Sequence, residues 1–227
     1  MTLFSAFSLP VRNAFGKNGK PFKKKETTMP LLPPALDGKI SVERAIKGRR
    51  TIRSFSDRKI TRKQLSQLCW AGQGVTEDNG FKRASPSAGA LYPADIYVVV
   101  GEGCVEKTEA GVYHYDSKRH VLEKKTGEDR RGDVAVAALS QMWMAEAPVQ
   151  FVVTVEFSRI TIKYRERGIR YALMEVGHIA QNILLQCRAS GLEGGIVGAF
   201  HDAKVAELIN AKENHDPLII LPVGYRG

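Results

Sequence analysis

The sequence predicts an α+β fold in which a mixed central β-sheet is flanked by helices. Three apolar, β-branched runs, at 95–100, 149–157 and 217–225, are typical of buried strands. Two segments, 61–72 and 170–190, repeat apolar residues at helical spacing and end at or beside a glycine. Strands and helices mix without strict alternation or an internal repeat, which points to an α+β or mixed α/β sheet with helices on its faces.

Length and composition indicate a single soluble globular domain. The 227 residues are 43% hydrophobic and 26% charged, as in ordinary globular proteins. Cys69, Cys104 and Cys187 are odd in number and far apart, which argues against a disulfide framework or a zinc site and for a reducing compartment. No apolar run approaches the roughly 18 residues that a membrane span requires. The opening segment lacks the basic region of a secretory signal, so we expect a soluble, cytoplasmic protein.

The net charge of +10, from 34 basic and 24 acidic residues, is partly concentrated near the N-terminus. Lysines crowd residues 17–25, so residues 1–30 are expected to form a flexible basic arm and residues 31–227 the single folded domain. A basic nucleic-acid-binding module is the alternative from another functional class. The absence of a helix-turn-helix, zinc-finger or RNP-type signature argues against it. If deletion of residues 1–28 abolishes all nucleic-acid affinity, the charge acts through the arm alone.

Residues 85–100 form the stretch around which the chain is organised. Its first half, Ser-Pro-Ser-Ala-Gly-Ala-Leu-Tyr-Pro, is a loop of small residues that lets a flat ligand approach the main chain closely. Its second half is an apolar strand that would hold the loop still. An ordinary turn before a strand is the alternative interpretation from the residues alone.

The segment Arg49-Arg-Thr-Ile-Arg53 carries three arginines within five residues. In an extended conformation Arg49, Thr51 and Arg53 point to one side, and guanidinium forks with a hydroxyl suit a phosphate or another anion. Taken alone, the segment is equally consistent with a solvated basic stretch.

Capping and periodicity predict several further elements. Thr61 and Gln64 form a capping box at the start of the first long helix. Residues 111–122 are two short runs around a polar turn, which indicates a β-hairpin. Asp133 is expected to cap a helix that continues to Met144.

The helix predicted over 170–190 has so few charges along its middle that its own sheet or a second subunit must cover it widely. His178 within it is expected to be a buried structural histidine. The glycine-rich run 194–200 is expected to be an apolar strand that exposes its backbone to something flat. Asp202 is then expected to cap the next helix.

Several ordered motifs together resemble the nitroreductase superfamily, most closely its SagB-type, azoline-oxidase-like branch. The resemblance covers about residues 31–226 and rests on Arg49–Arg53, Pro86–Pro93, Lys163-Tyr164, Gly177–Asn182 and Gly195–Phe200. It implies a three-layer fold that forms an interlocked homodimer, with FMN at the subunit interface and residues from both chains at each site. It implies no metal and no protein nucleophile.

By this resemblance, the arginine motif and a C-terminal basic residue hold the FMN phosphate and ribityl chain. Arg53 approaches the pyrimidine side, the Pro86 loop lies along the flavin from the partner subunit, and main-chain N–H groups near Gly198 face flavin N5 and O4. Lys163 and Tyr164 stand where azoline oxidases have a catalytic Lys-Tyr pair, which implies proton transfer. The implied cofactor-binding residues are Arg49, Arg50, Thr51, Arg53, Pro86, Ser87, Ala88, Gly89, Leu91, Val197, Gly198, Ala199 and Arg226.

The leading functional hypothesis is an FMN-dependent oxidoreductase that passes hydride from NAD(P)H to a small-molecule acceptor in a ping-pong sequence. The chain has no Rossmann G-x-G-x-x-G for a separately bound nicotinamide cofactor, which favours one shared face for both half-reactions. The alternative is an azoline (thiazoline or oxazoline) dehydrogenase that acts on a modified peptide.

Overall fold

The computed structural model describes residues 28–78 and 80–227, so most of the predicted N-terminal arm lies outside the described residues. Thr28–Pro30, which the sequence assigned to that arm, instead form strand β1 and pair with β4. The next residue, Leu31, packs into the main hydrophobic core. The folded part of the chain therefore begins at least three residues before the predicted boundary at residue 31.

A seven-stranded sheet in the order β1-β4-β3-β2-β5-β7-β6 forms the centre of the molecule. Neighbouring strands are antiparallel throughout, and parallel pairing in the described residues is confined to isolated bridges of Thr51 with Gly194 and of Ile60 with Val105. The predicted hairpin is confirmed as β3 and β4. The strands beyond β1 are β2 (Ala94–Val100), β3 (Gly111–Asp116), β4 (Val121–Thr126), β5 (Val149–Val155), β6 (Glu193–Gly194) and β7 (Asp216–Gly224).

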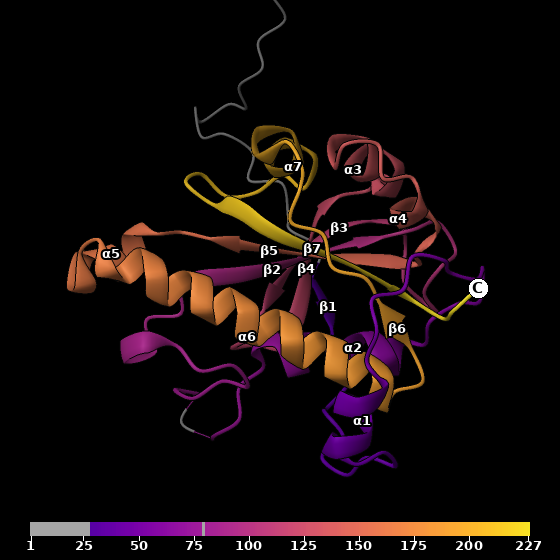
Figure 1. The fold of residues 1–227 in the computed structure, drawn as a ribbon, viewed down its shortest axis with the longest axis horizontal. Helices are drawn as coiled ribbons and strands as arrows, with labels where there is room; N and C mark the ends of the chain where they lie inside the picture. Colours follow the sequence, from indigo (N-terminus) through magenta and orange to yellow (C-terminus); the bar gives the residue numbers. More distant parts are fainter. Residues whose placement is uncertain (1–27, 79) are drawn as a thin grey trace, which may run out of the picture.

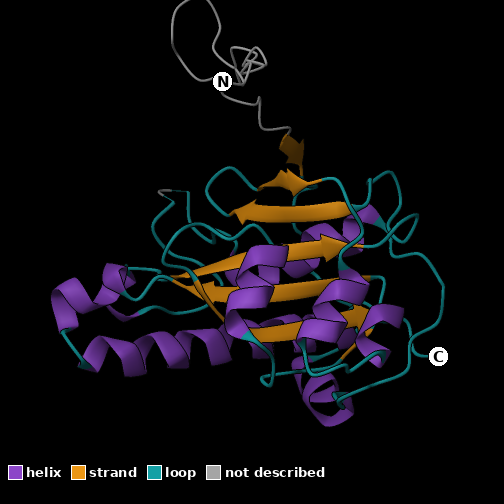
Figure 2. Cartoon of the chain, turned by 90° about the horizontal axis from the view of Figure 1, so that it is seen from above, coloured by secondary structure: helices purple, strands orange, loops and turns teal. Residues whose placement is uncertain are grey.

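Helices cover both faces of the sheet, so the predicted three-layer α+β architecture is confirmed (Figures 1 and 2). One face carries α1 (Val42–Gly48), α2 (Arg62–Gln73) and the long α6 (Arg167–Ala189). The other face carries α3 (Arg131–Ala137), α4 (Trp143–Glu146) and α7 (Asp202–Leu208). The short α5 (Ser158–Tyr164) leads into α6, and the 3-10 turn η1 (Ala88–Ala90) precedes β2.

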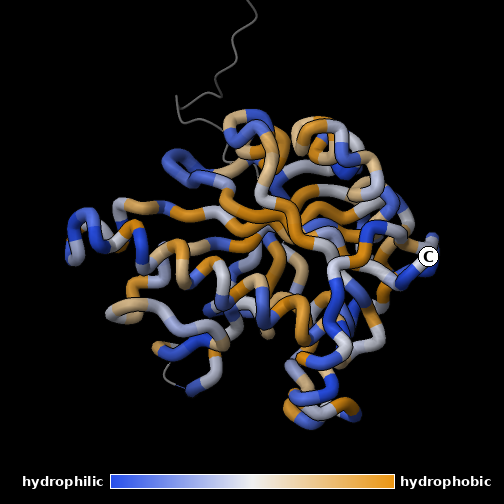
Figure 3. The backbone as a smooth tube through the Cα atoms, viewed as in Figure 1, coloured by the Kyte–Doolittle hydropathy of each residue, from blue (hydrophilic) through white to orange (hydrophobic). Residues whose placement is uncertain are grey.

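Strand β2 shows why one apolar run supports two helical layers. Successive side chains of a strand point to opposite faces, so Ile96 and Val98 join the core under α2 and α6, whereas Tyr97 and Val99 join the core under α3 and α7. A strand buried on both faces is apolar at nearly every position. Figure 3 shows the same arrangement, with hydrophobic residues along the central strands.

The region after α3 differs from the sequence expectation. Asp133 lies in the first turn of α3, which begins after Arg130, and the helix ends at Ala137 instead of continuing to Met144. Leu139 and Ser140 both adopt a left-handed backbone with φ of 57°, which a helix does not accommodate. The break lets α4 start in a new direction.

Three other local expectations were wrong. The run 194–200 is mostly irregular, with strand β6 limited to Glu193–Gly194 and a single later bridge between Val197 and Ile220. Helix α7 starts at Asp202 with His201 as its N-cap, and Asp202 lies in its first turn. His178 is exposed on the outer face of α6 and is not buried.

In the described residues, no helix combines the length and apolar character needed to cross a membrane.

Candidate functional site

The segment 49–53 runs in extended conformation past the edge of the sheet. The Ile52 N–H donates to the Gly194 carbonyl at 3.1 Å, and Thr51 forms a parallel bridge with Gly194. Helix α1 ends immediately before it, where the Arg49 N–H still donates to Ala45 O. Backbone pairing with β6 therefore fixes the segment and leaves its arginine side chains outside the core.

The C-terminus returns to the same place. Arg226 forms an antiparallel bridge with Phe55, and the Gly227 N–H donates to Ser54 O at 3.1 Å. A basic residue far away in the sequence thus joins the 49–53 segment. We call Arg49, Arg50, Arg53 and Arg226 the arginine cluster.

The arginine cluster carries charge that the protein itself does not neutralise. In the described part of the chain none of its members forms an ion pair with a carboxylate, although Arg131 and Arg159, elsewhere, pair with Asp129 and Asp95. The Arg50 guanidinium donates to main-chain carbonyls at the end of α1, at 2.8 and 2.9 Å. Guanidinium forks without carboxylate partners suit a dianionic phosphate, so this donor set fits the phosphate of FMN.

Trp143 joins the arginine cluster to the glycine-rich run. The Arg53 guanidinium lies 5.8 Å from the Trp143 ring centroid, within the range of a cation–π contact. A Cβ added to Gly195 would lie 2.8 Å from the Trp143 ring and 2.9 Å from Ile52 O, so this position admits only glycine. Close packing here brings residues 194–199 against the segment 49–53.

The backbone N–H groups of residues 197–199 differ in whether they form a hydrogen bond within the protein. The Val197 N–H donates to Ile220 O at 2.9 Å and is used within the fold. The N–H groups of Gly198 and Ala199 have no backbone acceptor in the described residues. A Cβ added to Gly198 would meet nothing within 4 Å. Open space beside free amide donors is what a flat heterocycle with carbonyl and imine acceptors requires.

The Ser87 loop, residues 86–91, is a tight turn with a left-handed backbone at Gly89 and Ala90, where φ is 62° and 52°. A Cβ added to Gly89 would lie 2.8 Å from the Tyr164 hydroxyl and 3.0 Å from Lys163 Nζ. The structure therefore brings the predicted loop and the predicted Lys-Tyr pair together.

Helix α5, which carries this pair, is anchored to the sheet by a half-buried ionic cluster. Arg159 donates to Asp95 at 2.6 Å and to Tyr92 O at 3.3 Å, so it ties α5 to both ends of the link between the Ser87 loop and β2. Burial alone would raise the pKa of Asp95, but the His114 hydrogen bond at 2.7 Å and the Arg159 charge hold it well below its usual range. His114, a possible metal ligand by residue type, is thus a structural partner of Asp95.

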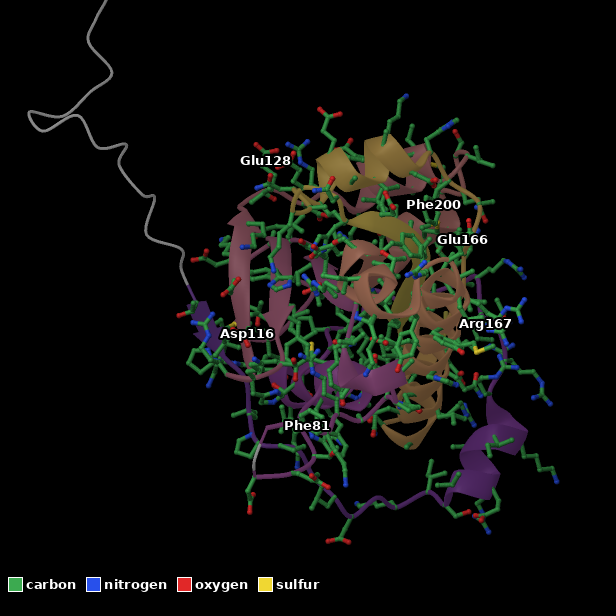
Figure 4. The ribbon with its side chains drawn as sticks, turned by 90° about the vertical axis from the view of Figure 1, so that its left-hand side faces the viewer. Phe81, Asp116, Glu128, Glu166, Arg167 and Phe200 are labelled. Atoms are coloured by element: carbon green, nitrogen blue, oxygen red, sulfur yellow. The ribbon has the colours of Figure 1, made fainter. Side chains whose placement is uncertain are left out.

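The two halves of the predicted site lie at opposite ends of α6. The helix has 23 residues and so spans about 34 Å at 1.5 Å per residue. Helix α5 and the Lys-Tyr pair lie at its start, while α1, β6 and the C-terminus lie near its end (Figure 1). Figure 4 looks from the α5 end, where Glu166 and Arg167 mark the beginning of α6. The two half-sites of one chain are therefore too far apart to contact the same small ligand.

The outer face of α6 exposes three apolar side chains near the start of the helix, with the exposed Arg170 and His178 beside them. Ile169, Leu173 and Met174 expose 44%, 50% and 52% of their surface, which is unusual for consecutive turns of one helix. Grooves of about 350 and 430 Å³ adjoin the far end of α6, between it, α1 and α2, and share Trp70 in their walls. The surface beside the site is thus suited to cover by another protein surface.

Sequence reasoning missed two residues at the site. Trp143 falls within the helix predicted from Asp133 to Met144, and no local pattern links it to Arg53. Glu175 is 1% exposed beneath the Ser87 loop. The available signal was its position, since it is a lone acidic residue three places after Ala172 and four before Ile179, on the apolar face of the helix.

Comparison with known proteins shows the family to which this fold belongs. The model of the nitroreductase family matches residues 46–225. The putative nitroreductase MJ1384 of Methanocaldococcus jannaschii is 40% identical over 197 residues, which cover 87% of this chain and 96% of that protein. The microcin B17-processing protein McbC of Escherichia coli is 27% identical over 172 residues, or 74% of this chain and 63% of McbC. The crystal structure of a putative nitroreductase from Ralstonia eutropha superposes with a TM-score of 0.75, at 24% identity, covering 88% of this chain and 90% of the other.

The fold and the site thus define a flavin-dependent oxidoreductase. This chain belongs to the nitroreductase family. The similarity to the microcin B17-processing protein McbC also supports the SagB-type branch that the motifs indicated.

Proposed function

We propose that two copies of this chain bind two FMN molecules at their shared interface and transfer hydride from NAD(P)H to a small-molecule acceptor in a ping-pong sequence. The observation that supports this proposal is the separation of the two half-sites along α6 (Figure 1). Two copies related by a twofold axis across this helix would place the arginine cluster of one copy beside the Ser87 loop of the other. Bound FMN supplies the chemistry that accepts and returns a hydride.

The protein's part is to bind, orient and stabilise charge. The arginine cluster donates hydrogen bonds to the phosphate, and Thr51 adds a hydroxyl beside it. Arg53, held over Trp143, would supply a cation beside the bound ring and would stabilise negative charge there. The free N–H groups of Gly198 and Ala199 hold the orientation of the ring. Pro86, Ala88 and Leu91 of the Ser87 loop cover it from the partner with small or apolar groups.

The proposal predicts that the purified protein is yellow and that NAD(P)H bleaches its flavin absorbance. Both effects follow if the arginine cluster retains the phosphate and the open face at Gly198 admits the nicotinamide. An absorbance spectrum as isolated, after FMN addition and after anaerobic NADPH or NADH, makes the measurement. A colourless protein that fails to retain added FMN would end the proposal.

Azoline dehydrogenation on a modified peptide is the second candidate function. Two observations favour it, the similarity to McbC and the contact of Lys163 and Tyr164 with the Ser87 loop. An exposed ammonium and a half-buried phenol next to the proposed ring face can hold and move a proton at the substrate carbon.

This second function predicts that Lys163→Ala lowers the rate of thiazoline oxidation by about 100-fold, within the usual range for loss of a general acid–base group. FMN retention should stay unchanged. Oxygen consumption with a thiazoline model compound measures the effect, and Lys107→Ala, another exposed lysine, is the control. Rapid flavin bleaching by NAD(P)H with no response to azolines would exclude this candidate in favour of the first.

A further inference from the structure

Glu175 is a buried carboxyl group for which the proposed reaction has no use. It lies on the inner face of α6, 1% exposed, with Ala172, Val176 and Ile179 as apolar neighbours on the same face. Transfer of a carboxylate out of water is costly unless partners compensate it. A residue kept at this cost calls for a specific role.

A hydrogen-bonded chain connects Glu175 to the region around the Ser87 loop. Arg83 donates from Nη1 to Gln73 Oε1 at 2.8 Å, and Gln73 donates from Nε2 to Glu175 Oε1 at 3.0 Å. The Arg83 guanidinium also stacks on the Tyr92 ring, at 4.2 Å from its centroid. These contacts thus connect Glu175 on α6, through Gln73 on α2, to Arg83 and Tyr92, which lie on either side of the loop.

The second oxygen of Glu175 is left without a fixed partner. Oε2 is buried and accepts no hydrogen bond from the described residues. The Ser87 hydroxyl and the Ala94 N–H lower the pKa of the carboxyl group, so both lie near it, although neither forms a hydrogen bond with Oε2. Ser87 Oγ already accepts from the Tyr92 N–H at 2.9 Å, so its own proton is available to the carboxyl group. Glu175 is therefore a polar support under the first turn of the loop.

The Ser87 loop needs such support. Ala90 and Tyr92 adopt left-handed backbone, with φ of 52° and 48°, which residues other than glycine hold only where the surroundings impose it. Immediately before the loop, Asn182 donates to Ala84 O at 3.2 Å and to Ser85 Oγ at 3.1 Å. Asn182 and Glu175 lie seven residues apart on α6, so the helix supports the loop at two points.

We propose that Glu175 positions the Ser87 loop for cofactor binding and that it does so with a proton bound. The link to the cofactor rests on the proposed function, in which this loop covers FMN. The link to the loop rests on the structure of this chain alone. A neutral carboxyl group is compatible with the dry site, whereas the ionised form leaves a charge on Oε2, which has no hydrogen-bond partner in the described residues, and draws water into the space beneath the loop.

The surroundings of Glu175 bring its pKa close to neutral pH. Burial raises the pKa of Glu175 to about 7, although Ser87, the Ala94 N–H, Arg83 and Gln73 lower it in part. Arg83, from the loop side, is the charged group among these neighbours, while α2 and β2 contribute the neutral amides. Because the folded-state pKa lies above its usual value of 4.5, the supported loop is favoured at low pH and weakened as pH rises through about 7.

Hydrogen exchange on the protein without added flavin tests the link to the loop. Protection factors of residues 86–91, corrected for the intrinsic pH dependence of exchange, are compared at pH 6 and pH 8.5. We expect about a tenfold loss of protection in the wild type and no change in Glu175→Gln, which keeps a neutral amide in place. Asn182→Ala is the matched control and should lower protection equally at both pH values, because no titrating group is altered.

Fluorescence titration with FMN tests the link between Glu175 and cofactor binding. Wild-type affinity should fall about tenfold between pH 6 and pH 8.5, and Glu175→Gln should lose this dependence. Should that variant not fold, Ser87→Ala takes its place and should move the loss of loop protection to higher pH, because the Ser87 hydroxyl lowers the pKa of Glu175. A wild type without a pH response, or a Glu175→Gln protein that keeps it, would overturn the role of Glu175. Absence of FMN binding at every pH would instead refute the proposed function, and hydrogen exchange would still decide the role of Glu175.

Discussion

Replacement of Met174 by aspartate should convert the protein to a monomer that no longer retains FMN. Met174 is 52% exposed on the apolar outer face of α6, next to Leu173 at 50%. A homodimer interface is typically as apolar as a domain core, and a twofold axis places the new carboxylate in it twice. At a cost of at least about 1.4 kcal/mol for each buried charge, dimerisation weakens 100-fold or more.

Loss of the partner removes half of each proposed site, so flavin retention should fall with the dimer. Size-exclusion chromatography with light scattering measures the mass, and absorbance measures bound flavin. Val136→Asp is the matched control, because Val136 is 55% exposed on α3, on the opposite face of the sheet. A Met174→Asp protein that remains dimeric and yellow would show that the α6 face is not the interface.

Arg49→Ala should weaken FMN binding by about 10- to 100-fold, since a hydrogen bond to a charged group contributes roughly 1.5–3 kcal/mol. Arg49 is half-buried, and its side chain has no carboxylate partner in the described residues. Arg50 already donates to two main-chain carbonyls, so Arg49 is the freer donor for a phosphate. Arg49→Lys should recover only part of the affinity, because an ammonium lacks the planar fork.

Titration of flavin fluorescence with riboflavin in parallel gives the sharpest reading of this prediction. Riboflavin lacks the phosphate, so Arg49→Ala should change its affinity little. Lys204→Ala on α7 removes one exposed positive charge elsewhere and is the control for net charge. Equal losses for FMN and riboflavin would place Arg49 away from the phosphate.

Local periodicity and capping were sufficient to predict most elements of the fold. The capping box of Thr61 and Gln64 is present at α2 as predicted, and the apolar runs form β2, β5 and β7 close to their expected bounds. These features depend on neighbours in sequence, so the sequence displays them directly. The expected helix from Asp133 to Met144 fails because its break depends on the left-handed Leu139 and Ser140, which no local signal marks.

The candidate site divides in the same way. Its motifs were visible as arginines, glycines and a Lys-Tyr pair, because each is contiguous in the chain. Their grouping was not visible, since Arg226 reaches the segment 49–53 by backbone pairing. Likewise, Trp143 meets Arg53 only because the helix breaks before α4.

The sequence by itself determined the layers of this protein, the family to which it belongs and the residue types available to hold a phosphate and a flat ring. Only the tertiary structure decided that the arginine cluster and the Lys-Tyr pair lie at opposite ends of α6. It also decided that apolar side chains on the outer face of this helix are exposed, and that Glu175 is buried near the Ser87 loop. The physical reason is that periodicity reports which side of an element is apolar. Packing between segments that are distant in the sequence determines which surface covers the apolar side and whether a charged group there remains hydrated.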